Sequence, residues 1–219
     1  LEYSTAAVKS ARAALRRMLR IAVDVAAALY PRDYRKLDAR IATVATWVGF
    51  DLDGRTDIGW NNSLGCRYQI ALTGLDELRA SLAAIRARHA QIGGETAAQL
   101  DTIARGLDAF TECFTIGLEA LGREPQDSLR LGRLNRLALE KRALKQDALG
   151  AVDGALAALL ADATCADELC KDLLVFRSEW AGTGLGLARL HFRLNSVQLH
   201  NAIRPDIAMR SAPDESGSR

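Results

Sequence analysis

One short stretch, residues 41–48, constrains the fold most, because it is rich in β-branched residues within a chain that otherwise carries helical periodicity. It reads Ile-Ala-Thr-Val-Ala-Thr-Trp-Val and predicts a buried strand. Gly49 ends the stretch, and Asp51 and Asp53 follow shortly after it. A buried strand must pair its backbone groups with a second strand. The best candidate for that partner is residues 187–193, Leu-Ala-Arg-Leu-His-Phe-Arg.

The rest of the chain predicts long helices, because apolar residues recur every three or four positions. The predicted helices cover residues 3–30, 64–92, 96–121 and 166–181, with two more in 128–161 joined near 146–150. Residues 182–186 contain three glycines and predict a turn from a helix into the second strand. We expect residues 1–210 to form a single helical domain and the polar residues 211–219 to be a disordered tail.

The first predicted helix has an apolar side and a basic side. The apolar side consists of Val8, Ala11, Leu15, Met18, Ala22, Val23, Ala26 and Leu29. Arg12, Arg16 and Arg20 lie on the other side, where a basic stripe is more often an exposed or salt-bridged face than a phosphate site. We therefore expect the three arginines to form a solvated or salt-bridged face.

The charge balance narrows the classes of partner. The 219 residues include 29 basic and 27 acidic ones, which gives a net charge of +2 and does not favour nucleic acid or an anionic membrane. No apolar run reaches the ~20 residues of a membrane helix, and no secretory leader opens the chain.

The four cysteines lack zinc-site spacing, so we expect reduced, buried thiols in a cytoplasmic protein. The missing initiator methionine suggests part of a longer protein.

The Asp-x-Asp-Gly sequence after the first predicted strand can be interpreted as a calcium-binding loop or as the active site of a phosphatase. A calcium loop requires a glycine where Thr56 stands and a closing glutamate where Asn62 stands. Phosphatases of the haloacid dehalogenase type place Asp-x-Asp-Gly-Thr after a buried strand, which would make Asp51 the nucleophile and Asp53 the acid/base. Arg55 replaces the threonine of that motif, and the alternating strands that carry its later residues are missing.

Two segments together resemble phosphoenolpyruvate carboxylase. Residues 47–54, Trp-Val-Gly-Phe-Asp-Leu-Asp-Gly, are similar to the W-x-G-G-D-R-D-G segment of that family. Residues 187–196, Leu-Ala-Arg-Leu-His-Phe-Arg-Leu-Asn-Ser, are similar to its L-V-R-I-D-I-R-Q-x-S segment. In the family these segments are strands of a central barrel surrounded by helices. The resemblance thus implies a mainly α fold, a long-helix bundle with two short parallel strands that form a piece of a (β/α) barrel.

The resemblance also implies an activity, the conversion of phosphoenolpyruvate and bicarbonate to oxaloacetate and phosphate with magnesium. The position of the phosphate-binding, catalytic arginine is Arg193, whose planar fork suits phosphate oxygens. Trp47 corresponds to the tryptophan that walls an apolar pocket for carbon dioxide, where water would protonate the enolate. Asp51 and Asp53 belong to the same substrate segment, although capping the turn and pairing with arginines is an alternative role for them.

Several departures from the family pattern limit what this chain can do alone. Phe50, Leu52, Arg55 and His191 replace a glycine, an arginine, an asparagine and an aspartate of the family segments. The T-A-H-P-T-E histidine motif and the magnesium ligands lie outside this chain. We therefore expect a segment of a carboxylase-like enzyme that is inactive alone and homo-oligomeric in the full-length protein. A non-catalytic helical scaffold or interaction module is the alternative from a different class.

The second predicted strand supplies a geometric expectation. Side chains alternate between the two faces of a strand, so Arg189, His191 and Arg193 should share one face. Arg193, at the end of the strand, should point into the mouth of the barrel. Arg189 should lie deeper and pair with an acidic residue such as Asp51.

Overall fold

The computed structural model describes residues 2–51, 58–122, 128–183, 186–191 and 200, and within them it is mainly helical with two short parallel strands. The helices are α1 (Glu2–Leu29), η1 (a short 3-10 helix, Tyr34–Lys36), α2 (Trp60–Arg88), α3 (Gly94–Gly122), α4 (Ser128–Glu140), α5 (Arg142–Ala161) and α6 (Asp167–Thr183). The strands are β1 (Ala45–Thr46) and β2 (Arg189–Leu190). The prediction of a helical bundle with a parallel strand pair is confirmed.

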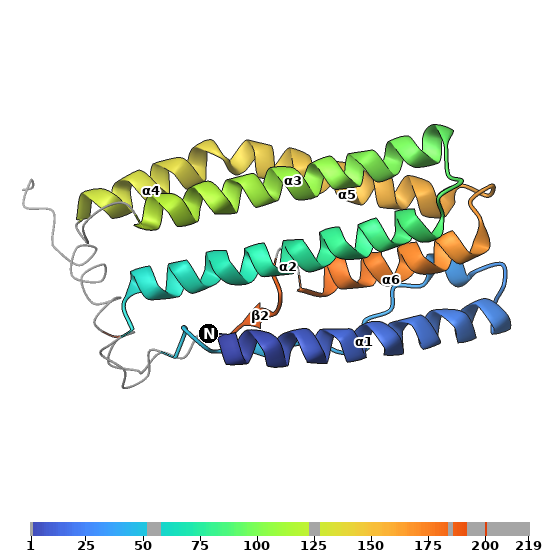
Figure 1. Cartoon of the computed structure of the whole chain (residues 1–219), viewed down its shortest axis with the longest axis horizontal. Coiled ribbons are helices and arrows are strands. Elements are labelled where there is room, and N and C mark those ends of the chain that lie inside the picture. The colour runs from blue at the N-terminus through green and yellow to red at the C-terminus, as the bar shows by residue number, and fades with distance from the viewer. Residues whose placement is uncertain (1, 52–57, 123–127, 184–185, 192–199, 201–219) are drawn as a thin grey trace, which may run out of the picture.

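The long helices run side by side along the long axis of the molecule (Figure 1). α3 packs against α2 and α5, whereas α1 packs mainly against α6 and forms one outer edge of the bundle. The strand pair lies between α1 and α2, close to the start of α1 (Figure 1). Burying apolar side chains between helices supplies the main stabilising free energy of such a bundle.

The periodicity of three of the helices identifies the core correctly. Of the apolar stripe predicted for α2, Leu75, Leu78, Leu82 and Ile85 are buried, whereas Tyr68 and Leu72 are half-buried. The core positions predicted for α3 and α6 are also buried, except for the half-buried Leu118 of α3: Leu100, Ile103, Leu107, Phe110 and Phe114, together with Leu169, Leu173, Phe176 and Trp180. The aromatic rings of Phe110 and Trp180 meet at a centroid distance of 5.9 Å, which joins α3 to α6.

α1 buries only part of its apolar side. Leu19 and Val23 are buried against the bundle, but Met18 and Leu29 of the apolar side are 51% and 66% exposed. Arg12, from the basic side, is only 3% exposed. The basic side also faces the bundle because α6 presents acidic side chains to it, and these pair with the arginines of α1. An apolar stripe is therefore left facing outward.

The junction between the fourth and fifth helices also differs from the prediction. It falls at Lys141 rather than near residues 146–150, and Gly150 and Gly154 both lie inside α5. Nothing lies within 4 Å of a Cβ placed on either glycine, so both face open space. Val152 and Leu156 are buried, and their packing keeps the helix continuous through the glycines.

The two strands pair as predicted, in parallel, with Ala45 opposite Arg189 and Thr46 opposite Leu190. Both are much shorter than the predicted stretches, and the residues from 192 to 199 lie outside the described part of the chain. The reason lies in the neighbouring backbone groups. The Leu187 N–H donates to the carbonyl of Ile70 in α2 at 3.1 Å, and the carbonyls of Gly186 and Leu187 accept from Arg12. These groups are satisfied by helices, so the ladder does not extend.

Among the described residues, none of the helices combines the length and the apolar character that crossing a membrane requires. The four cysteines are free, and Cys113, Cys165 and Cys170 are buried, as predicted.

Candidate functional site

The carboxyl ends of the two strands form one edge of the sheet, and both resemblance segments reach it. Trp47 follows β1, and His191 follows β2. The His191 N–H donates to the Thr46 carbonyl at 2.9 Å, which fixes the two segments side by side. The Trp47 side chain is 54% exposed and His191 is exposed, so both are accessible at this edge.

A tight turn follows β1 and depends on a glycine. The Phe50 N–H donates to the Trp47 carbonyl at 2.9 Å, and Gly49 has φ of 84° in the third position of this turn. A positive φ there favours glycine, because a side chain would meet the backbone. The Ser63 hydroxyl of α2 donates to the Gly49 carbonyl at 2.8 Å, so the turn is also tied to a helix.

Phe50 anchors this turn in a small apolar cluster of its own. Its side chain is 1% exposed and packs with Ile70 of α2 and Leu187 beside β2. Phe50 stands where the carboxylase segment has a glycine. Here the residue has a packing role, which is to hold the turn after β1 against the turn before β2.

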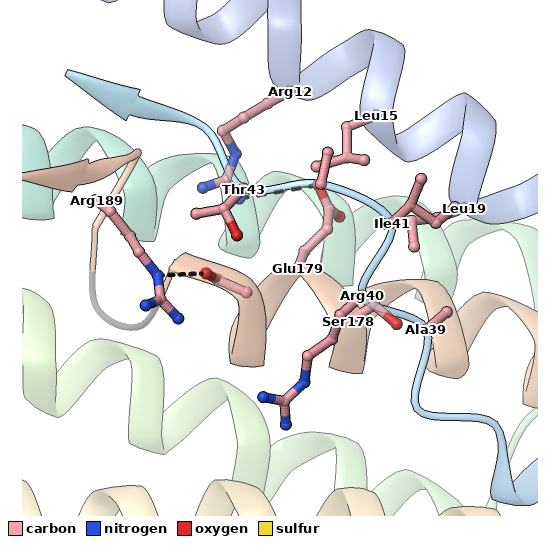
Figure 2. Close-up of a pocket in the computed structure, with 12 residues that line it drawn as sticks. Arg12, Leu15, Leu19, Ala39, Arg40, Ile41, Thr43, Ser178, Glu179 and Arg189 are labelled. Atoms are coloured by element: carbon pink, nitrogen blue, oxygen red, sulfur yellow. Dashed lines mark hydrogen bonds and ion pairs between the residues drawn. The ribbon is translucent and has the colours of Figure 1, made fainter.

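The structure locates only part of the predicted site. Asp51 is half-buried directly after Phe50, while Asp53 and Arg193 lie outside the described residues. The prediction for Arg189 is wrong, because its side chain is exposed and its Nε donates to the Gly182 carbonyl at 3.3 Å. The Arg189 side chain lies beside the end of α6 instead of deep in the sheet (Figure 2).

Replacing Gly49 with alanine should lower the free energy of unfolding by about 2 kcal/mol, because a positive φ is strained for L-residues. The new Cβ would also lie 2.5 Å from Sγ and 2.9 Å from Cβ of Cys66. Urea denaturation of the variant measures the loss. The double variant with Cys66→Ala keeps the contact to the Cys66 Cβ and the strained φ but removes the Sγ contact, so it should recover part of the stability. An unchanged midpoint for Gly49→Ala would show that the turn relaxes freely.

A small cavity of about 40 Å³ lies at the opposite, amino-terminal end of the strand pair (Figure 2). Ile41 and Thr43 line it from the segment before β1, and Glu179 lines it from α6. Such a volume accommodates a few water molecules, and it is too small for a phosphorylated three-carbon acid. It is therefore a structural cavity rather than a substrate pocket.

Two buried charged groups border this cavity. Arg12 of α1 donates through Nη1 to the carbonyls of Gly186 and Leu187 at 3.1 and 3.0 Å. Its Nη2 lies 3.8 Å from Glu179, which also accepts two hydrogen bonds of 2.9 Å from Arg16 Nε. Burial raises the pKa of Glu179, an effect that the attraction of Arg16 and Arg12 only partly offsets. Burial likewise lowers the pKa of Arg12.

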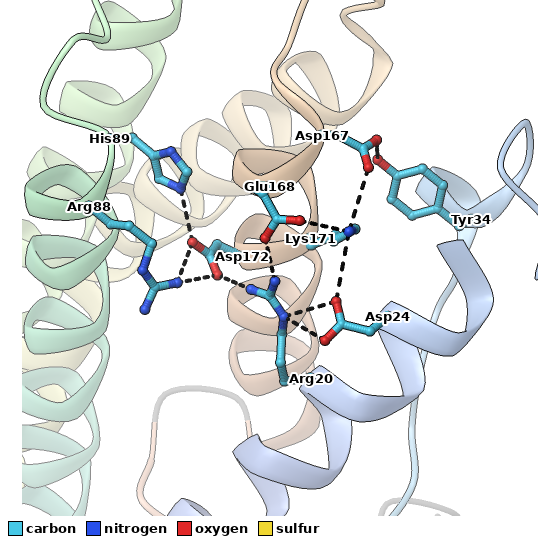
Figure 3. Close-up of polar contacts among 9 residues, drawn as sticks. All are labelled: Arg20, Asp24, Tyr34, Arg88, His89, Asp167, Glu168, Lys171 and Asp172. Atoms are coloured by element: carbon cyan, nitrogen blue, oxygen red, sulfur yellow. Dashed lines mark hydrogen bonds and ion pairs between the residues drawn. The ribbon is translucent and has the colours of Figure 1, made fainter. Parts of the chain in front are cut away.

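A larger polar network joins α1, α2 and α6 around Asp172 (Figure 3). The Asp172 carboxylate is 8% exposed and accepts from Arg20 at 2.5 Å, from Arg88 at 2.6 and 2.7 Å, and contacts His89 Nε2 at 3.0 Å. Glu168 accepts from Lys171 and Arg20, and these hydrogen bonds lower the pKa of Glu168. His89 is thus a partner of a carboxylate, as expected for a half-buried histidine in a helical core.

The network continues toward η1. The hydroxyl of Tyr34 donates to Asp167, and burial together with this hydrogen bond raises the pKa of Tyr34 to about 12. The groove of about 680 Å³ between α1, α2 and α6 is lined by four arginines, yet three of them already bind carboxylates: Arg16, Arg20 and Arg88. Its charges are largely neutralised by their neighbours. Such a network specifies how the helices pack, which is a structural role.

Sequence reasoning missed the acidic partners in α6, although a signal for them exists. Arg12, Arg16 and Arg20 recur every four residues, and Glu168, Asp172 and Glu179 fall on one side of α6 with helical spacing. Two complementary stripes of this kind favour a helix–helix contact over two solvated faces. The prediction of a solvated or salt-bridged basic face is confirmed, because Arg16 and Arg20 form ion pairs with α6.

The described residues do not gather three or more histidine, cysteine, aspartate or glutamate side chains in an arrangement that would hold a metal ion. The described residues that follow the two strands at the carboxyl edge of the sheet include Trp47, Asp51 and His191. No known family model, no characterised protein and no solved structure matches this chain.

Proposed function

We propose that this chain is a segment of a phosphoenolpyruvate carboxylase-like enzyme and carries part of its substrate site. One observation supports the proposal more than any other, the parallel pairing of Ala45 with Arg189 and of Thr46 with Leu190. Parallel strands present their carboxyl ends at the same edge, where α/β proteins bind their ligands. Both segments that resemble the family reach that edge, although five helices of the chain lie between them in the sequence. In a longer protein, β1 and β2 would be neighbouring strands of a helix-surrounded barrel.

Each proposed site residue has a distinct role. Arg193, three positions after β2 in the sequence, binds the substrate phosphate through charge-assisted hydrogen bonds. Trp47 offers an exposed indole at the same edge and forms the apolar wall that keeps water away from the enolate. Asp51 and Asp53 follow Phe50 in the sequence and orient the basic groups around the phosphate.

Magnesium, which the resemblance implies, does not fit the residues that the structure describes. No suitable group of ligating side chains occurs among them, and the buried carboxylate of Asp172 already contacts two arginines and a histidine. The metal ligands of the proposed enzyme therefore lie outside the described residues. The role of this chain is to bind and orient the substrate.

Phosphoenolpyruvate binding by the 219-residue chain tests this proposal, since the chain alone is not expected to turn the substrate over. Replacing Arg193 with alanine should weaken binding by ~2 kcal/mol, or about 30-fold, because a charged hydrogen-bonding partner of the phosphate is lost. Titration calorimetry with phosphoenolpyruvate and with inorganic phosphate gives the affinities.

The matched control is Arg189→Ala, which removes an exposed arginine from β2, four positions before Arg193. It should leave the affinity for phosphoenolpyruvate unchanged. Equal affinities of the wild type and the Arg193→Ala variant would refute the phosphate role of Arg193. Equal losses in both variants would indicate general electrostatic attraction instead of a site.

A second candidate function is a non-catalytic helical interaction module. The observation that favours it is the outward-facing apolar stripe of α1, which includes Ile21 and Leu29, 63% and 66% exposed. A module of this kind would not bind phosphoenolpyruvate, so the same titration separates the two candidates.

A further inference from the structure

The outward face of α1 carries a heptad pattern. Successive apolar residues on it are separated alternately by four and three positions: Ala7, Ala11, Ala14, Met18, Ile21, Val25 and Ala28. This spacing is that of the a and d positions of a coiled coil, with Ala11, Met18 and Val25 at a. We call these seven residues the α1 seam.

Most of the seam is exposed on the part of the protomer that the structure describes. Met18 is 51%, Ile21 is 63% and Val25 is 51% exposed, and six of the seven residues are exposed. α1 lies at the outer edge of the bundle (Figure 1), and its inner face is already occupied by Leu19, Val23 and the buried Arg12. A contiguous apolar stripe over three heptads on one helix is a typical interface feature.

We propose that the α1 seam binds the α1 seam of a second copy of this chain, and that the two helices run antiparallel. The two-fold axis passes between Leu19 and Arg20, so that Met18 of each copy packs against Ile21 of the other. The next layers outward pair Ala14 with Val25. The bulky side chains then meet at the centre of the interface, and the alanines lie at its ends, where the helices can approach closely.

Charge complementarity selects the antiparallel direction. Arg17 and Asp24 flank the seam on the same side, at successive g positions. In the antiparallel pair they lie beside each other across the interface, twice by symmetry. Arg17 is exposed and forms no ion pair with any residue that the structure describes. Asp24 pairs with Arg20 of its own helix at 3.1 Å, and its side chain is still 46% exposed, so it can also accept from a second arginine.

A parallel pair would place these charges unfavourably. At the g-to-e contacts of a parallel coiled coil, Arg17 would face Ala22 and Asp24 would face Leu29 of the second copy. Each charge would lose contact with water and gain no partner. The antiparallel pair instead brings the apolar e residues, Leu15 and Ala22, together on the other flank.

Sedimentation of the 219-residue chain over a concentration series tests the proposal. The wild type should be a dimer at high micromolar concentration, and Ile21→Glu should weaken self-association by more than about a hundredfold, since it places a charge in the two central layers. Ile21 is exposed in the protomer, so the variant should keep the helical circular dichroism spectrum. The control is Leu139→Glu on α4, where the leucine is 60% exposed, and it should leave the dimer intact.

A charge exchange tests the direction of the helices. Arg17→Glu and Asp24→Lys should each weaken self-association by about tenfold, because each places like charges across the interface. An equimolar mixture should restore it, since every flanking pair in the heterodimer is again of opposite charge. A wild type that stays monomeric, or a dimer that survives Ile21→Glu, overturns the proposal. A mixture without recovery overturns the antiparallel pairing.

Discussion

The Arg12→Ala variant should lose about 4 kcal/mol of unfolding free energy, the largest loss that we expect from a single substitution in this chain. Arg12 is 3% exposed and joins three distant parts of the structure: its own helix α1, Glu179 of α6 and the backbone before β2. Removing its side chain leaves the carbonyls of Gly186 and Leu187 buried without their donor. It also leaves a cavity beside Leu15 and Leu19.

Urea denaturation followed by circular dichroism measures this loss. The matched control is Arg79→Ala, which removes an arginine from an ion pair with Asp108 at 3.0 Å, where both side chains are about half exposed. A surface pair of this kind contributes between about 0 and 1 kcal/mol. Similar losses in the two variants would contradict the anchoring role of Arg12. Arg12→Lys should recover little stability, because one ammonium group does not reproduce the geometry of the guanidinium.

The second large effect is expected for Gly74→Ala, with a loss of about 3 kcal/mol. A Cβ on Gly74 would lie 2.4 Å from the carbonyl carbon of Gly186 and 2.5 Å from the nitrogen of Leu187. These are backbone atoms, which cannot rotate away as a side chain can. The segment before β2 would have to move from α2, and the hydrogen bond from Leu187 to Ile70 would break.

Gly154→Ala in α5 is the control, since nothing lies within 4 Å of its added Cβ. It should stabilise the protein by about 0.5–1 kcal/mol through the higher helix propensity of alanine. Melting temperatures of the two variants should therefore shift in opposite directions. A Gly74→Ala variant as stable as the wild type would show that the contact between α2 and the strand segment is loose.

Local sequence patterns predict the helices of this protein because each helix interior repeats its apolar residues over many turns. They predict the strand pair because one β-branched run needs a partner, and residues 187–193 offer the best one. They do not decide which side of α1 faces the bundle, because this helix is apolar on two sides. The choice between those sides depends on the contacts that Asp172 and Glu179 make with the arginines of α1. Both acidic residues follow Arg20 by more than 150 positions, so a local sequence pattern does not reveal that they lie close to α1.

The sequence likewise predicts some features of the candidate site and not others. The meeting of the two segments at one edge follows from their parallel pairing, and the glycine after β1 follows from the turn. The burial of Phe50 was not predictable, because its pocket is built from Ile70 and Leu187 of two other segments. The same is true of Arg189, whose bond to the Gly182 carbonyl depends on how α6 ends.

The contact between Arg12 and the carbonyl of Gly186 joins positions 174 residues apart, and β1 pairs with a strand that is nearly as distant. A ribosome adds about 5–20 residues per second, so roughly 10–35 seconds separate the synthesis of Arg12 from that of its partners. Throughout that interval, the nascent chain holds an uncompensated arginine and an open strand edge. Contacts of such long range also slow folding. This protein should therefore depend on chaperones that shield α1 and β1 until β2 has been synthesised.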